Sequence, residues 1–146
     1  MLYTMKDKKD NKVYIVKSMD EVKLKEANDL FVVKLDGAKL HTYYEFEKAA
    51  KAAFQTPTDK SMIWLNEPGN EWVCWMEYLD WLLDAGFNSF ALIVENWSKA
   101  LDRDKERKEK WLLRDLRYTC DFWGDEIVEC SLGNVEPKDF NIYLVG

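Results

Sequence analysis

Four acidic residues lie close together in the middle of the chain: Glu71, Glu77, Asp80 and Asp84. Carboxylates grouped in this way can form an acid–base pair for sugar cleavage, bind a hard cation, or form an electrostatic face for a basic partner. Sugar cleavage needs carboxylates that face each other from different elements, whereas residues on one helix point in similar directions. Cation sites typically use acids spaced as Asp-x-Asp, which this chain lacks. Recognition of a basic partner is therefore the favoured chemistry.

The charge around these acids is segregated from the rest of the chain. The whole sequence has 27 acidic and 21 basic residues, but Ser61 to Trp97 contains six acids and no Lys, Arg or His. The remainder therefore has 21 of each sign, and the net charge of −6 resides in this stretch. Five of the seven tryptophans lie there too: Trp64, Trp72, Trp75, Trp81 and Trp97. A local negative field with aromatic side chains is typical of a surface that recognises a basic protein, although any single acid could equally belong to a solvated helix face.

A helix of about four turns is predicted for the centre of this stretch. Asn70 can cap its start, Glu71 suits the positive end of its dipole, and Gly86 can end it in a left-handed conformation. Spacings of three and four predict a buried stripe and, beside it, a second stripe that carries the acids. The buried stripe is Trp72, Trp75, Met76, Leu79 and Leu83, and the second is Val73, Glu77, Asp80 and Asp84. Trp64 and Trp81 are the tryptophans expected to be exposed.

Strands and helices alternate along the rest of the chain. Strands are predicted at Leu30 to Leu35, Phe90 to Val94 and Phe140 to Val145, with a possible small strand at Ile127 to Leu132. A Thr42–Glu45 capping box starts a helix that ends near Pro57. A second helix has the charge run Arg103 to Lys110 as its solvated first turn or two, keeps helical spacing from Leu112 to Trp123, and stops at Gly124. The crossovers are too long for hairpins, so we expect an α/β fold, a small and mostly parallel β-sheet with packed helices.

The first 28 residues are expected to extend this domain, which spans residues 29–146. Lys12 to Lys17 alternates enough to predict a short edge strand, with Val13 and Ile15 facing inward. A capping box at Ser18 to Glu21 predicts a brief helix after it. The extension is thus expected to be a tail, a possible edge strand and a short helix.

The region from about Asp29 to Gly146 resembles the barstar family of intracellular inhibitors of secreted barnase-type ribonucleases. The likeness rests on a glycine-containing loop followed by an acidic helix, Trp72-Val-Cys-Trp75-Met-Glu77-Tyr-Leu79. It also rests on the order and spacing of the strands Phe31–Gly37, Ala91–Trp97 and Phe140–Val145. The resemblance implies a barstar-like fold and a stoichiometric inhibitor that blocks a basic active-site cleft.

The resemblance also assigns roles to single residues. Glu77 takes the position of the family's principal acid, usually Asp, which stands in for substrate phosphate. Gly69 matches the loop glycine that allows close backbone approach to the enzyme. The chain departs from the family at three places. Val73 replaces an acid, Met76 replaces an aromatic contact residue, and Glu67-Pro68 replaces an aromatic pair. These departures favour a target other than barnase. The predicted partner-binding residues are Glu67, Gly69, Asn70, Glu71, Val73, Met76, Glu77, Asp80, Trp81 and Asp84.

Other features narrow the function class. The chain shows no charged-then-apolar leader and no apolar run approaching 18 residues, so secretion and membrane spanning lack support. The three cysteines, Cys74, Cys120 and Cys130, are odd in number and widely spaced. We therefore expect reduced thiols and a cytoplasmic location. His41 has no nucleophile motif beside it and is interpreted as a surface or capping residue. The mixed charges of Arg103 to Lys110 do not predict a basic face for phosphate.

We therefore expect no enzyme activity, no cofactor, no metal, and no direct binding to nucleic acid or membrane. The expected partner is a basic ribonuclease or nuclease toxin, and the free protein is expected to be a monomer. The alternative is a cytoplasmic protein-interaction module on a barstar-like scaffold with a non-nuclease partner. A carbohydrate-binding or enzymatic role is a distant third.

Overall fold

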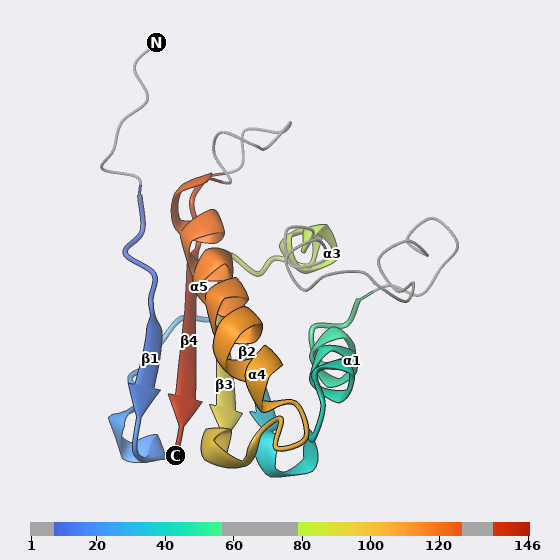
Figure 1. Cartoon of the computed structure of the whole chain (residues 1–146). Helices are drawn as coiled ribbons and strands as arrows, with labels where there is room; N and C mark the ends of the chain where they lie inside the picture. Colours follow the sequence, from blue (N-terminus) through green and yellow to red (C-terminus); the bar gives the residue numbers. More distant parts are fainter. Residues whose placement is uncertain (1–7, 57–78, 127–135) are drawn as a thin grey trace.

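The fold is a small α/β layer in which a parallel sheet carries helices on one face (Figure 1). A computed structural model describes residues 8–56, 79–126 and 136–146. Its strands are β1 (Val13–Val16), β2 (Leu30–Asp36), β3 (Ser89–Glu95) and β4 (Asp139–Val145). They lie in the order β1-β4-β3-β2, and every neighbouring pair is parallel. The predicted α/β class with a mostly parallel sheet is confirmed.

The two central strands are the most apolar. β3 is buried from Ser89 to Val94, as expected for a continuous apolar run that is covered on both faces. Leu92 of β3 pairs in register with Ile142 of β4, and both side chains are completely buried. The predicted strands at Leu30, Phe90 and Phe140 are therefore confirmed. β2 and β4 are longer than predicted by one residue at one end, and β3 by one residue at both ends.

Helix α1 (Tyr43–Ala53) begins where the capping box predicts. The Thr42 hydroxyl accepts a hydrogen bond from the Glu45 N–H at 3.2 Å, and the Glu45 carboxylate accepts one from the Thr42 N–H at 3.1 Å. Two backbone donors at the helix start are thereby satisfied. Thr42 therefore sets the point at which the chain turns from the sheet into α1.

The remaining helical segments are short or irregular. A second long helix runs without interruption through α4 (Lys105–Arg107), a π-helical segment (Lys108–Leu112), α5 (Leu113–Asp121) and a second π-helical segment (Phe122–Glu126). Single 3₁₀ turns occur at Met19–Glu21, Gly37–Lys39 and Trp97–Lys99, and α3 spans Asp80–Asp84. No helix in the described ranges is long and apolar enough to cross a membrane. The predicted strand at Ile127 to Leu132 lies outside the described residues.

The helices pack on one face of the sheet and form the main core. Phe46 and Ala50 of α1 and Leu116 of α5 join one buried cluster with Leu92 and Ile142 of the central strands. Leu79 and Leu82 at α3 belong to the same cluster. Each helix therefore presents its apolar stripe to the sheet and its polar side to solvent.

Gly124 does not stop the helix, because it lies inside the segment Phe122–Glu126. A Cβ atom at Gly124 would lie 2.7 Å from the carbonyl oxygen of Lys9, and the Lys9 N–H donates to the Gly124 carbonyl at 2.9 Å. The glycine allows the N-terminal segment to cross close to the helix, a tertiary contact that local sequence does not reveal.

The N-terminal segment completes the sheet and covers its other face. β1 pairs with β4 at one edge, as predicted, and the following residues Met19 and Val22 pack with Val16 against a second buried cluster. That cluster consists of Ile93, Tyr143 and Val145. The Tyr143 hydroxyl donates to the Lys23 carbonyl at 2.9 Å. The predicted brief helix shortens to the turn Met19–Glu21, whose capping box is present.

Ile15 is the exception to the predicted alternation in β1. It was expected to face inward, but its side chain is 63% exposed. It pairs with Leu144 and so lies on the helix-bearing side of the sheet, but β1 is the edge strand and this position is not covered. The alternation correctly predicts the face of the sheet on which Ile15 lies, but not that the helices leave this edge position exposed.

Candidate functional site

The predicted partner-binding surface is only partly within the described residues. Its first seven residues lie outside them: Glu67, Gly69, Asn70, Glu71, Val73, Met76 and Glu77. Asp80, Trp81 and Asp84 lie in α3 and can be placed. Trp64 and the predicted buried Trp72 and Trp75 also lie outside. The geometry of the site is therefore known at the C-terminal end of the predicted acidic helix.

The end of α3 is formed as the sequence predicts. Gly86 has a φ of 100° and follows the C-cap residue Ala85. Its N–H donates to the Leu83 carbonyl at 3.0 Å, and the Phe87 N–H donates to the Leu82 carbonyl at 3.0 Å. This pair of hydrogen bonds is a Schellman motif, which fixes the last turn of α3 and the entry into β3.

Asp80 and Asp84 lie four residues apart on α3, and both are exposed. Within the described part of the chain, neither forms an ion pair with a lysine or arginine. Two like charges at this spacing repel each other slightly, so helix stability does not account for the pair. The two carboxylates remain available to a basic partner, as the sequence predicts for the stripe that carries the acids.

The buried side of α3 differs slightly from the predicted stripe. Leu79 is completely buried, as expected. Leu82, which was not in the predicted stripe, is also buried, with 1% of its surface exposed, whereas the predicted Leu83 is only partly buried. Trp81 is not the exposed residue that was predicted. It is partly buried, and its Nε1–H donates to the carbonyl of Phe54 at 2.8 Å. Trp81 therefore fixes α3 to the end of α1, because an indole N–H near a core needs a hydrogen-bond acceptor.

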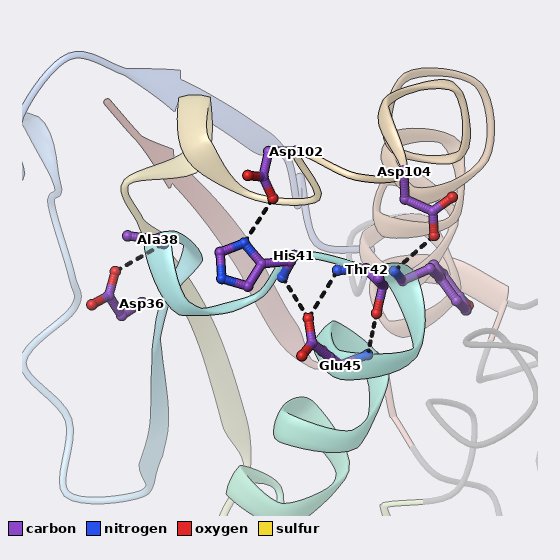
Figure 2. Close-up of polar contacts among 8 residues, drawn as sticks. Asp36, Ala38, His41, Thr42, Glu45, Asp102 and Asp104 are labelled. Carbon is purple, nitrogen blue, oxygen red and sulfur yellow. Dashed lines mark hydrogen bonds and ion pairs between the residues drawn. The ribbon is translucent and has the colours of Figure 1, made fainter.

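A second polar cluster lies where the chain leaves β2, at the carboxyl end of the sheet (Figure 2). His41 Nδ1 lies 2.8 Å from the Asp102 carboxylate, and the Asp104 carboxylate accepts from the Tyr43 N–H at 3.0 Å. The Leu101 N–H also donates to the Leu40 carbonyl at 2.7 Å. These bonds join the segment before α1 to the segment before α4, and we call this set of contacts the loop clasp.

The neighbouring Asp36 is held in a similar way. Its carboxylate accepts hydrogen bonds from the side chain of Asn96 at 2.9 Å and from the N–H of Ala38 at 3.0 Å. The Asn96 bond, and after it the Ala38 bond, lowers the pKa of Asp36. Asp36 therefore joins the ends of β2 and β3 as an anion.

The loop clasp includes the cap of α1. The backbone N–H of His41 donates to the Glu45 carboxylate at 2.8 Å, so His41 belongs to the cap of α1 as well as to the pair with Asp102. His41 thus lies at the start of α1, as the sequence predicts, and its half-buried side chain pairs with Asp102. Among the described residues the free thiol of Cys120 is buried, and burial raises its pKa to about 12, so it is no nucleophile. No group of three metal-ligating side chains occurs in the described ranges.

The loop clasp predicts a pH-dependent contribution to stability. The hydrogen bond from His41 lowers the pKa of Asp102 in the folded protein. The ionised Asp102 carboxylate therefore stabilises the fold above the ordinary carboxyl pKa, near 4. This stabilisation is lost as the pH falls through the lowered pKa of Asp102 in the folded protein. We expect the difference in Tm between the parent and Asp102→Asn to be largest above about pH 5 and to shrink as the pH falls below about 4. Thermal melts at each pH measure it.

The control is Asp20→Asn, which removes an exposed carboxylate for which the described residues provide no ion pair. Its Tm difference from the parent should not follow the same acid-dependent course. A constant difference for Asp102→Asn over the whole pH range would show that the clasp does not depend on the charge of Asp102.

The sequence did not reveal the pairs of the loop clasp. His41 and Asp102 are 61 residues apart, as are Tyr43 and Asp104, and no local pattern links them. The capping box was the only available signal, and it identified Glu45 correctly.

No protein-family model, curated protein or solved structure matches the chain.

Proposed function

We propose that the chain is a stoichiometric protein inhibitor of a barnase-type ribonuclease or a related nuclease toxin. The acidic helix and the loop before it, residues 66–84, would block the basic active-site cleft of the enzyme. The observation that carries the proposal is the segregation of charge: the net charge of −6 resides between Ser61 and Trp97, where no basic residue occurs. A nuclease cleft that binds phosphate is positively charged, so the two surfaces are complementary.

The described end of this helix supports the proposal. Asp80 and Asp84 are exposed on the same short helix, and α3 is fixed by the Trp81 bond to Phe54 and by the Schellman motif. A surface that is held in place before binding loses less conformational entropy in the complex. The all-parallel sheet with its helices also agrees with the scaffold that the barstar resemblance implies. The proposed inhibitor is monomeric when free and acts in the cytoplasm.

Carboxylates in such a complex would meet Arg, Lys or His of the enzyme. Each charge-assisted bond contributes about 1.5 to 3 kcal/mol net. The charges would also accelerate the encounter, so association should slow as salt is added. The effect of charge on such pairs is well established for barnase and its inhibitor, which serve as the standard example.

The test is a titration of a nuclease with the purified chain. The enzymes are a panel of barnase-type ribonucleases, and a fluorogenic RNA reports their activity. We expect activity to fall linearly to zero at equimolar protein. Asp80→Lys combined with Asp84→Lys should weaken inhibition about 100-fold or more, because attraction becomes repulsion. Glu77→Lys should have a comparable effect.

The matched control is Glu26→Lys, the same charge reversal at an exposed acid far from α3 in sequence. It should inhibit as well as the parent protein. Full nuclease activity at equimolar protein, or equal inhibition by Glu77→Lys, would exclude the proposed mechanism.

The alternative is a cytoplasmic interaction module that binds a non-nuclease partner through the same residues. The departures from the barstar pattern at Glu67, Pro68, Val73 and Met76 favour it. It predicts that a pull-down from the cell captures a specific partner and that Glu77→Lys loses this binding. It also predicts no inhibition of barnase-type ribonucleases.

A further inference from the structure

The long helix from α4 to α5 carries a band of exposed aromatic and basic side chains. We call it the aromatic–basic ridge, and it consists of Arg107, Lys110, Trp111, Arg114, Arg117 and Tyr118. Spacings of three and four place these residues on one side of the helix. Trp111 is 48% exposed and Tyr118 is 36% exposed, although large aromatic side chains are usually well buried. The apolar residues on the other side of the same helix, such as Leu112 and Leu116, lie in the core.

Several side chains of the ridge are held in position. The Arg114 guanidinium lies 4.8 Å from the centre of the Trp111 ring, and the carboxylate of the buried Asp115 accepts its hydrogen bond at 3.1 Å. Tyr118 stacks on Phe122 with 6.3 Å between the ring centres. Preordered side chains lose little entropy when a partner binds, so the ridge is suited to binding.

The ridge has the composition of a protein-binding hot spot. Trp, Tyr and Arg are the residues that contribute most of the binding energy in protein interfaces. Four of its six side chains are basic. Lys110 pairs with Glu106, and Arg114 pairs with Asp115. Arg107 and Arg117 therefore carry most of the charge that complements an acidic partner. Its sign is opposite to that of α3, where Asp80 and Asp84 are exposed. The ridge cannot therefore serve the same basic partner as α3.

The acids around the ridge distinguish a protein from a nucleic acid. Glu109 and Asp121 are exposed on the same helix, and Glu106 pairs with Lys110 at 3.3 Å. A phosphate backbone needs a continuous run of cations and would be repelled by these acids. A polypeptide can place single carboxylates beside the arginines and avoid the acids. The acids therefore favour a protein partner.

We propose that the aromatic–basic ridge binds an acidic segment of a partner protein, with apolar side chains of that segment covering Trp111 and Tyr118. The inference is independent of nuclease inhibition, because the ridge shares no residue with the stretch 66–84. The chain would then have two interaction surfaces of opposite charge.

A random peptide library displayed on phage and selected against the whole chain tests this proposal. We expect the enriched peptides to be acidic with at least one large apolar residue, and their affinity to fall as salt is raised. Synthetic copies are then titrated with the parent and with Trp111→Ala combined with Arg117→Ala, which should weaken binding about tenfold or more. Arg114 is retained, because its loss would leave the buried Asp115 unpaired.

The matched control is Tyr44→Ala combined with Lys48→Ala, which removes an exposed aromatic residue and an exposed basic residue from α1. It should bind the peptides like the parent, and so should Glu77→Lys. Circular dichroism melts establish that the variants are folded. If no acidic peptide binds the ridge but the chain still inhibits a nuclease, the ridge proposal is refuted and the proposed function is unaffected.

Three results would overturn the proposal. The enriched peptides could lack acidic residues, or they could bind the Trp111/Arg117 variant as tightly as the parent. Alternatively, a labelled oligouridylate could bind more tightly than any peptide and depend on Trp111, in which case the ligand is single-stranded RNA.

Discussion

Replacing Gly37 by alanine is expected to destabilise the protein by about 3 kcal/mol or more. Gly37 is buried at the end of β2, where the chain turns toward α1. A Cβ atom there would lie 2.7 Å from the carbonyl oxygen of Asn96, 2.8 Å from that of Glu95 and 2.9 Å from the Cβ atom of Ala100. Two of these atoms belong to the backbone and the third is fixed directly to it, so none can rotate away. The end of β3 would have to shift away from β2.

Urea unfolding monitored by tryptophan fluorescence measures this effect as a lower midpoint with an unchanged slope. Lys39→Ala is the control in the same turn. Its side chain is exposed, so the change should stay within about 0.5 kcal/mol. Equal midpoints for the two variants would show that β3 moves without cost and that Gly37 is not needed for close approach.

Gly37 illustrates what the sequence can and cannot predict. The pair Asp36-Gly37 after an apolar run correctly predicts the end of a strand. The sequence cannot show that the glycine is required by the backbone at Glu95 and Asn96, because that contact depends on the pairing of β2 with β3. Local pattern therefore located the turn, but only the fold explains why a glycine occupies it.

The same distinction applies to the other elements. The strands and the start of α1 follow from periodicity and a capping box, which depend only on neighbouring residues. Gly124, Ile15 and Trp81 were misinterpreted because their surroundings come from distant segments. Gly124 meets Lys9, and Trp81 meets Phe54, across separations that no local pattern spans.

In the candidate site, the helical pattern correctly predicted that Asp80 and Asp84 are exposed and that Gly86 ends the helix. Both properties follow from positions within one helix. The partner-binding roles of these residues stay predictions, because they depend on a second molecule.

The aromatic–basic ridge was not recognised in the sequence, where the acids between its basic residues make the segment look evenly mixed. Only the structure shows that Trp111 and Tyr118 are exposed beside these basic residues.

Removing residues 1–28 is expected to abolish cooperative folding of the remainder, although the barstar resemblance covers only residues 29–146. The truncation removes β1 from the edge of the sheet and uncovers Ile93, Tyr143 and Val145 on the face opposite the helices. Burial of a large apolar side chain contributes about 1.5 to 3 kcal/mol, so losing the cover on three costs about 5 kcal/mol. The total stability of a domain is about 5 to 15 kcal/mol.

Polar contacts add to the loss. The Asn11 side chain donates to the carbonyls of Cys120 at 3.0 Å and Lys138 at 2.9 Å, and so joins the N-terminal segment to α5 and to the start of β4. Without Asn11 these carbonyls lose a buried donor, which costs about 1 to 3 kcal/mol. Asn11→Ala alone should therefore lower the stability by a similar amount while the fold is kept.

The measurement is a set of thermal melts and amide proton–nitrogen spectra of three chains: the parent, residues 8–146 and residues 29–146. Residues 8–146 retain every contact described above and should melt like the parent. Residues 29–146 should give poorly dispersed spectra and no sharp transition. If this shorter chain instead melts cooperatively at the parent's midpoint, then the cover over Ile93, Tyr143 and Val145 contributes little. In that case the first 28 residues are an addition to a self-sufficient domain.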